Sequence, residues 1–225
     1  MTSLNTKALV SVFVLTAGMT LLILLPAGAM SYWQAWVYLA EFFIASILIT
    51  LYLIKHDPAL LERRMRGGPT AESRPSQRII MLFISIGFIG LLIVPALDHR
   101  FGWSHVPELV VIVGDVLVAA GFLLIAIVYR ENTFTSATIQ VTKDQKVIST
   151  GPYAIVRHPM YFGALLYLIG TPLALGSYWG LLAFIAIVPF LIWRIYDEEQ
   201  TLAHELPGYA EYQRHTRYRL IPGVW

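Results

Sequence analysis

The fold is decided by one apolar run near the C-terminal end, which reads MYFGALLYLIGTPLALGSYWGLLAFIAIVPFLIWRI over residues 160–195. A membrane-spanning helix needs ~20 apolar residues, so this run is far too long for a single span. Pro172 and Gly176 interrupt the run near its middle, and both residue types favour a break in a helix. The run therefore predicts a helical hairpin, with one helix over residues 161–175 and a second over residues 178–196.

Four apolar stretches upstream of the hairpin are each long enough to cross a bilayer. They cover residues 8–25, 33–54, 79–97 and 107–129. Hydrophobic residues make up 57% of the chain and charged residues 13%, against about 25% charged residues in average soluble domains. The sequence predicts an all-α, polytopic membrane helical bundle with about five to six spans, a C-terminal helical hairpin and a cytoplasmic tail. The first stretch lacks a convincing cleavage site, so we expect a retained helix there rather than a signal peptide.

Basic residues indicate how the spans are oriented, because cytoplasmic loops carry an excess of Lys and Arg. With the N-terminus in the cytoplasm, all but one of the 16 Lys and Arg residues fall on the cytoplasmic side, and the exception is Arg100. Aromatic residues beside the weakly charged loops fit the opposite interface, where amphipathic rings concentrate. They are Trp33, Trp36, Trp103, Tyr178 and Trp179. Both termini are therefore expected in the cytoplasm.

The segment before the hairpin contains the motif GPYAIVRHPMYFG over residues 151–163. Pro159 suits the first turn of a helix, because its φ is preset. Arg157 and His158 are therefore expected at the N-terminus of the first hairpin helix, where free backbone N–H groups create a positive partial charge. An anion such as a carboxylate or phosphate would stabilise cations at this position, and a lipid phosphate on Arg157 is the simpler alternative.

A second polar cluster, RIYDEEQTL over residues 194–202, lies where the second hairpin helix leaves the membrane. Arg194 and Glu198 are spaced i to i+4 and share one helix face. Acidic residues at a helix C-terminus oppose the helix dipole, which favours a compensating partner over a merely solvated helix end. The hairpin returns this cluster to the surface that holds Arg157 and His158. Cations on one segment and carboxylates on the other suit a zwitterionic ligand.

Two ionisable residues fall inside predicted spans, Glu41 in the second and Asp115 in the fourth. Charged groups are costly in a bilayer, so each is a candidate functional residue, with a hydrogen bond between helices as the alternative. Other kinds of site are excluded by composition and spacing. The chain has no cysteine, its six histidines lack the spacing of a helical metal pair, and no glycine-rich dinucleotide motif follows a strand. We expect no metal site.

Together these motifs resemble the isoprenylcysteine carboxyl methyltransferase family of integral membrane enzymes. The resemblance covers residues 132–225, through the motif at 151–163, through Glu198 and Glu199, and through Tyr209 and Tyr212. It implies S-adenosylmethionine as methyl donor, bound by the C-terminal part of the chain. The chain then divides into an N-terminal four-helix membrane region, 1–130, and a C-terminal cofactor-binding hairpin and tail, 131–225. The implied cofactor-binding residues are Tyr153, Arg157, His158, Pro159, Tyr161, Glu198 and Glu199.

The implied reaction is carboxyl O-methylation of an isoprenylcysteine-like or other lipophilic acceptor, at the cytoplasmic face of a membrane such as the bacterial inner membrane. Arg194 and Glu198 are the expected catalytic residues, with Arg194 holding the acceptor carboxylate as a bidentate partner. A carboxylate is ionised at pH 7, so it needs no general base. We expect a lipophilic or prenylated acceptor and membrane lipid as partners and no nucleic acid, and the oligomeric state is left open.

Three alternatives remain open from the sequence. The first is phospholipid or small-amine N-methylation, which would need a base such as Glu41, Asp115 or Glu199. The second is an enzyme similar to the NADPH-dependent sterol reductases, which share an Arg-x-Pro-x-Tyr segment. Met160 and Ala164 stand where those enzymes usually have Asn and an acidic residue. The third is a non-enzymatic lipid-binding membrane module.

Overall fold

Helices are the only regular elements in the part of the chain that the computed structural model describes, residues 3–142 and 144–225. In chain order they are α1 (Ser3–Ala27), α2 (Trp33–His56), α3 (Pro58–Met65), η1 (Pro69–Ala71), α4 (Pro75–Phe101), α5 (Glu108–Glu131), η2 (Gly151–Ala154), α6 (Pro159–Ala174), α7 (Gly180–Glu205) and α8 (Tyr209–His215). Five of them, α1, α2, α4, α5 and α7, are long and apolar enough to cross a membrane, while α6 is shorter at 16 residues. The predicted all-α polytopic bundle is confirmed. Lys143, which the sequence places in a cytoplasmic loop, lies outside the described residues.

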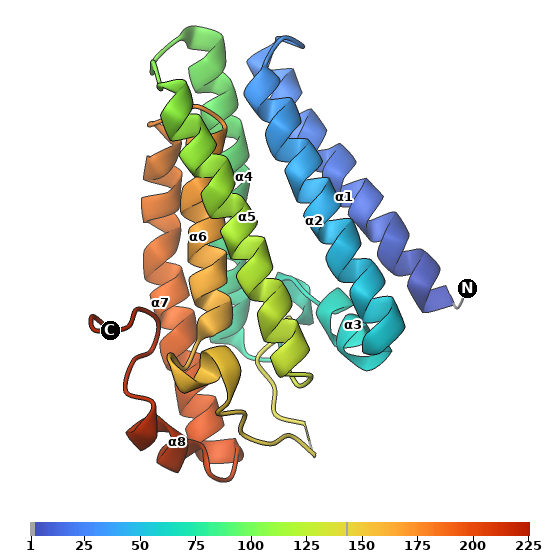
Figure 1. Cartoon of the computed structure of the whole chain (residues 1–225), viewed down its shortest axis with the longest axis vertical. Helices are drawn as coiled ribbons and strands as arrows, with labels where there is room; N and C mark the ends of the chain where they lie inside the picture. The colour runs from blue at the N-terminus through green and yellow to red at the C-terminus, as the bar shows by residue number, and fades with distance from the viewer. Residues whose placement is uncertain (1–2, 143) are drawn as a thin grey trace.

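The long helices form one bundle of α4, α5, α6 and α7, with α1 and α2 as a tilted pair beside it (Figure 1). Within the bundle α5 packs along α6 and α4 packs along α7, and α1 contacts α4. The short helices α3 and α8 lie at the same end of the molecule as the linker between α5 and α6 (Figure 1). The basic linkers that the sequence assigns to one side of the membrane therefore meet at one end of the structure.

Glycines allow α5 and α6 to approach each other closely. A Cβ atom at Gly121 would lie 2.6 Å from the carbonyl oxygen of Gly163, and one at Gly170 would lie 2.7 Å from the carbonyl oxygen of Gly114. Any larger residue would push the helices apart, and such small-residue contacts are typical of membrane helix pairs. Because α6 is held firmly against α5, the position of its N-terminus is fixed as well.

The turn between α6 and α7 follows the predicted break. Gly176 has φ of +66°, a left-handed value that glycine adopts without strain. The buried carboxylate of Asp98 accepts hydrogen bonds from the Ser177 hydroxyl at 2.5 Å and from the Ser104 amide at 2.7 Å. Asp98 thereby ties the hairpin turn to the loop that follows α4.

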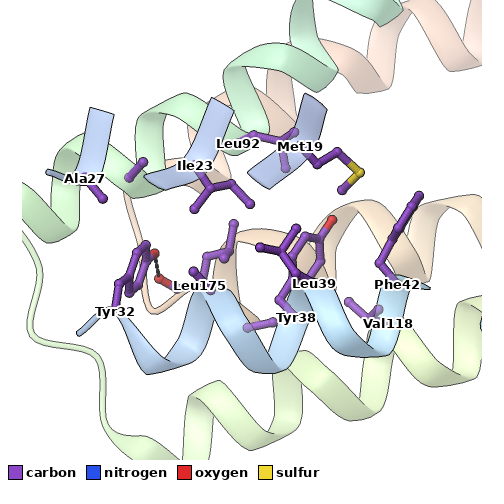
Figure 2. Close-up of a cluster of buried hydrophobic side chains, with 13 residues drawn as sticks. Met19, Ile23, Ala27, Tyr32, Tyr38, Leu39, Phe42, Leu92, Val118 and Leu175 are labelled. Atoms are coloured by element: carbon purple, nitrogen blue, oxygen red, sulfur yellow. Dashed lines mark hydrogen bonds between the residues drawn. The ribbon is translucent and has the colours of Figure 1, made fainter. Parts of the chain in front are cut away.

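A hydrophobic core fills the space where α1 and α2 meet the bundle. In Figure 2 the side chains of Met19 and Ile23 lie opposite those of Tyr38 and Leu39, and all four are buried. The Tyr32 hydroxyl donates a hydrogen bond to the carbonyl oxygen of Leu175 at the hairpin turn, drawn as a dashed line in Figure 2. The N-terminal pair of helices is therefore anchored to the hairpin as well as to α4.

The structure differs from the sequence prediction mainly in the polar segments. The linker over residues 55–78 contains α3 and η1, and the tail contains α8, none of which was predicted. Helix α3 starts where it does because the Asp57 side chain accepts a hydrogen bond from the Leu60 amide at 2.9 Å and Pro58 occupies the first turn. The ends of the long helices also extend beyond the apolar residues that predicted them, as at Pro75 and Phe101 of α4.

Candidate active site

A cavity of about 330 Å³ is lined by residues of α3 and α8 together with residues of the long helices. Its size falls in the range of small-molecule sites, roughly 300–1,000 Å³. The side formed by the long helices is apolar. It is lined by Met81, Ile84, Ile125, Ala164 and Leu191. The opposite side is formed by polar residues of the motif at 151–163, the exit of α7 and the linker over residues 132–148.

The hairpin brings the predicted site residues together, with one exception. Those that line the cavity are Tyr153, Arg157, His158, Pro159, Tyr161, Arg194 and Glu198. The exception is Glu199, which is buried and is not among the residues that line the cavity. Pro159 begins α6 as expected, so Arg157 and His158 do precede the first turn of that helix.

Glu199 is the anion that stabilises the cations at the start of α6. Its carboxylate accepts hydrogen bonds from Arg157 Nε at 2.6 Å and from Arg219 Nε at 2.8 Å, and it lies 3.3 Å from His158 Nε2. The backbone amides of Arg157 and His158 donate to the carbonyl oxygens of Tyr218 and Arg219, at 2.9 and 2.8 Å. The anion expected at this helix terminus is thus supplied by the chain itself. In the structure Glu199 closes the tail over the start of α6, instead of forming part of the cavity surface as a cofactor ligand would.

Glu198 is the carboxylate that faces the cavity. The Tyr161 hydroxyl donates to Glu198 Oε2 at 2.6 Å and accepts a hydrogen bond from Arg194 Nε at 3.1 Å. A chain of three side chains therefore fixes the position of Glu198 at the polar side of the cavity. Its only protein partner at hydrogen-bond distance in the described structure is Tyr161, which leaves its other oxygen for a bound molecule.

Arg194 has a different environment from the one expected of a residue that binds the acceptor. Its three guanidinium nitrogens contact protein groups. Nε contacts Tyr161, Nη1 donates to Gln77 at 2.5 Å, and Nη2 donates to the Ala137 carbonyl at 3.0 Å and pairs with Glu72 at 2.8 Å. The expected bidentate grip on an acceptor carboxylate would require these partners to leave. In the structure Arg194 positions Tyr161 and the linker that covers the cavity.

The linker over residues 132–148 covers the cavity and is called the covering linker below. It is held in place by residues from the N-terminal part of the chain. Arg64 of α3 donates to the Ser136 carbonyl at 2.6 Å, and Glu72, only 1% exposed, accepts from the Ile139 amide at 3.3 Å. Arg64 also lines the cavity. Neither Arg64 nor Glu72 was singled out from the sequence. The run of basic residues around Arg64 was the only signal, and it was attributed to membrane orientation.

Two hydroxyl groups at the cavity have no hydrogen-bond partner among the described residues. They belong to Tyr209 of α8 and Thr135 of the covering linker, and both residues line the cavity. Buried polar groups are nearly always paired, so an unpaired hydroxyl on a residue that lines a cavity is a candidate to bind a ligand or a water molecule there. Burial raises the pKa of Tyr209, which keeps this hydroxyl protonated and able to donate.

Glu41 and Asp115 lie away from the site, on α2 and α5, and neither lines the cavity. One buried oxygen of each, Oε2 of Glu41 and Oδ1 of Asp115, lacks a hydrogen-bond partner in the described structure. Neither residue is placed to take a proton from a molecule in the cavity. Their expected role as candidate bases is not supported by this geometry.

Residues 109–206 match the family model described as phospholipid methyltransferase, a family that includes the isoprenylcysteine carboxyl methyltransferases. The matched segment runs from α5 to the end of α7 and contains every residue that was expected to bind the cofactor or to act in catalysis. The resemblance to integral membrane methyltransferases is thereby confirmed, and together with the helical bundle it supports a membrane methyltransferase.

A curated relative extends the comparison. The chain is 28% identical over 109 residues to the cobalt-zinc-cadmium resistance protein CzcN of Cupriavidus metallidurans. The alignment covers 46% of this chain and 49% of that protein, so the chain spans about half the length of the curated relative it matches.

Proposed function

We propose that this protein is an S-adenosylmethionine-dependent methyltransferase of a lipophilic acceptor, and that its main reaction is carboxyl O-methylation. The observation that carries the proposal is a cavity with an apolar side at the level of the long helices and a polar side lined by Glu198 and by Tyr209, whose buried hydroxyl is unpaired among the described residues. On the charge pattern of the linkers, the site faces the cytoplasm, in a membrane such as the bacterial inner membrane.

The residues present suit the proposed donor. S-adenosylmethionine supplies a methyl group that is already activated on a sulfonium. Glu198 would hold the cationic amino group, because it is the one carboxylate among the described residues that line the cavity. Tyr153, His158 and Tyr161 would complete the polar side. The volume of about 330 Å³ and the mixed polar and apolar lining fit a molecule of this kind.

The residues of this chain would act by orientation and by exclusion of water. Methyl transfer to an ionised carboxylate moves no proton, so no general base is required. The linker held by Arg64, Glu72 and Arg194 covers the cavity, which keeps water away from the reacting groups. The reaction neutralises two opposite charges, and the apolar side formed by Ile84 and Leu191 favours that change.

A second cavity supports a lipophilic acceptor. It has a volume of about 500 Å³ and an almost entirely apolar surface, formed by α1, α4 and Leu168 of α6. Ile84 lines both this cavity and the candidate site. A hydrocarbon chain in the second cavity would thus end beside the first. The acceptor's reactive group could then reach the donor while its apolar part stays at the level of the membrane helices.

Phospholipid or small-amine N-methylation is a second candidate, because the family description names phospholipid methyltransferases. An amine must lose a proton, and Glu198 is the carboxylate in place to accept it. The two reactions leave different products, since a methyl ester is hydrolysed by alkali and an N-methyl group is not.

The test incubates the purified protein with methyl-labelled S-adenosylmethionine and a membrane lipid and protein extract. Alkali-labile label in a lipophilic product is expected for the main proposal, and alkali-stable label would favour the amine. Absence of transfer to any product, together with binding of NADPH, would contradict both and favour a reductase. Binding of neither S-adenosylmethionine nor NADPH would favour a membrane module without enzymatic activity.

A further inference from the structure

Tyr209, in the first turn of α8, has a buried hydroxyl with no protein partner. Its side chain lines the cavity and only 4% of the residue is exposed. The hydroxyl finds no hydrogen-bond partner within residues 3–142 and 144–225. A buried hydroxyl that lacks a partner is unfavourable, because its desolvation is not offset by a hydrogen bond. The fold tolerates this group although phenylalanine would fill nearly the same space.

The position of Tyr209 is fixed by its neighbours. It packs in a small hydrophobic cluster with Leu206 and Tyr212, against Val147 of the covering linker. The Tyr212 hydroxyl donates to the Tyr153 carbonyl at 2.7 Å, which ties α8 to the motif at 151–163. The unpaired hydroxyl is therefore held in place before any ligand binds. Binding does not have to order this side chain, which favours affinity.

The groups around Tyr209 are the charged groups of the site. Burial raises the pKa of its hydroxyl most, the carboxylates of Glu199 and Glu198 raise it further, and Arg157 lowers it. The hydroxyl thus stays protonated and lies among the charged groups of the site. Glu199 already pairs with Arg157 and Arg219, and no acceptor among the described residues lies within hydrogen-bond distance of the Tyr209 hydroxyl.

We infer that Tyr209 binds the amino-acid end of the methyl donor, by donating a hydrogen bond to its carboxylate while Glu198 holds its ammonium group. The inference rests on the proposed function for the identity of the donor. The charged end of the ligand then lies at the polar side of the cavity, between α8 and the exit of α7.

The test compares two ligands that differ only in this end. S-adenosylhomocysteine carries the amino-acid group, and 5′-methylthioadenosine has a methyl group in its place. Both are titrated by calorimetry into the full-length protein in detergent, as wild type and as Tyr209→Phe. We expect Tyr209→Phe to weaken S-adenosylhomocysteine about tenfold, the loss of one hydrogen bond to a charged group, and to leave 5′-methylthioadenosine unchanged.

Stability provides the second readout. Because the removed hydroxyl has no protein partner, Tyr209→Phe should unfold at the wild-type temperature or above it. The matched control Tyr212→Phe loses the hydrogen bond to Tyr153 and should unfold at a lower temperature. Tyr218→Phe, at an exposed position of the tail, should change neither stability nor affinity.

The outcomes separate this inference from the proposed function. Equal S-adenosylhomocysteine affinity in wild type and Tyr209→Phe, or an equal loss for both ligands, would overturn the role of Tyr209 alone. A wild-type protein that binds no S-adenosylhomocysteine would overturn the proposed donor, and this inference with it.

Discussion

Replacement of Glu199 by Ala should destabilise the C-terminal tail more than any other single change at the site. Glu199 pairs with Arg157 at 2.6 Å and with Arg219 at 2.8 Å, and the side chains of Glu199 and Arg157 are each only 6% exposed. Removal of this carboxylate leaves the Arg157 guanidinium buried without its anion. Breaking a buried pair in this way typically costs about 3–5 kcal/mol.

We expect Glu199→Ala to loosen the C-terminal tail locally and also to lower the stability of the whole protein. Arg157 also donates to the carbonyl oxygens of Thr216 and Arg217, both at 2.8 Å, so its displacement would release the segment after α8. Thermal unfolding in detergent should shift to lower temperature. Trypsin should cleave the tail faster at Arg214 and Arg217, which are exposed.

The matched control is Glu205→Ala, which breaks an exposed ion pair on the same helix. Glu205 lies 3.3 Å from Arg74, and their side chains are 50% and 39% exposed. Such a pair contributes at most about 1 kcal/mol. If Glu199→Ala unfolds at the same temperature as Glu205→Ala, with its tail equally protected from trypsin, the assignment of Glu199 as the residue that closes the tail is refuted.

Three further predictions concern the bundle, the hairpin turn and the tail. Gly114→Ala should lower the unfolding temperature, because its Cβ would lie 2.2 Å from the backbone of α6 and overpacking costs about 1–3 kcal/mol; Gly18→Ala, with open space around it, should not. Asp98→Asn should lower stability by about 1–3 kcal/mol, because an amide replaces one of two carboxylate oxygens that accept hydrogen bonds in a buried site, and unchanged unfolding would contradict this role. Burial raises the pKa of Tyr212 from 10.0 to about 12, so its contribution to stability is complete below pH 10 and is lost as the pH rises toward 12. Unfolding followed between pH 9 and 12 should therefore show a steeper loss in wild type than in Tyr212→Phe, and identical slopes would exclude this effect.

The hairpin and the meeting of its two ends could be predicted because their causes are local in the sequence. An apolar run of excess length must turn, and Pro172 and Gly176 show where it does so. Pro159 marks the start of α6 through its fixed backbone angle. Once both ends of the hairpin are on one surface, Arg157 and His158 necessarily lie near the acidic exit of α7.

The distinct roles of Glu198 and Glu199 could not be predicted in the same way. The two residues are adjacent, but successive side chains of an α-helix point about 100° apart, so one faces the cavity and the other faces the tail. Which residue faces which way depends on the rotation of α7 against α4 and α6, and the sequence gives no direct measure of it.

The spacing of residues along the sequence could not predict the partners of Arg194 either. Gln77 and Glu72 precede Arg194 by more than a hundred residues, and they reach it only because α4 packs along α7. The expectation that Arg194 would bind an acceptor assumed that a cation near the cavity is free. The structure shows that this cation holds the covering linker in position.

The most direct test of the central claim is equilibrium binding of S-adenosylhomocysteine to the detergent-purified protein and to Glu198→Gln. The variant keeps an oxygen to accept from Tyr161 but loses the charge that faces the cavity. Wild type should bind, Glu198→Gln should bind at least about tenfold more weakly, and the exposed control Glu211→Gln should match wild type. Equal affinity in all three proteins, or no binding by wild type, would contradict the assignment of this cavity as the donor site.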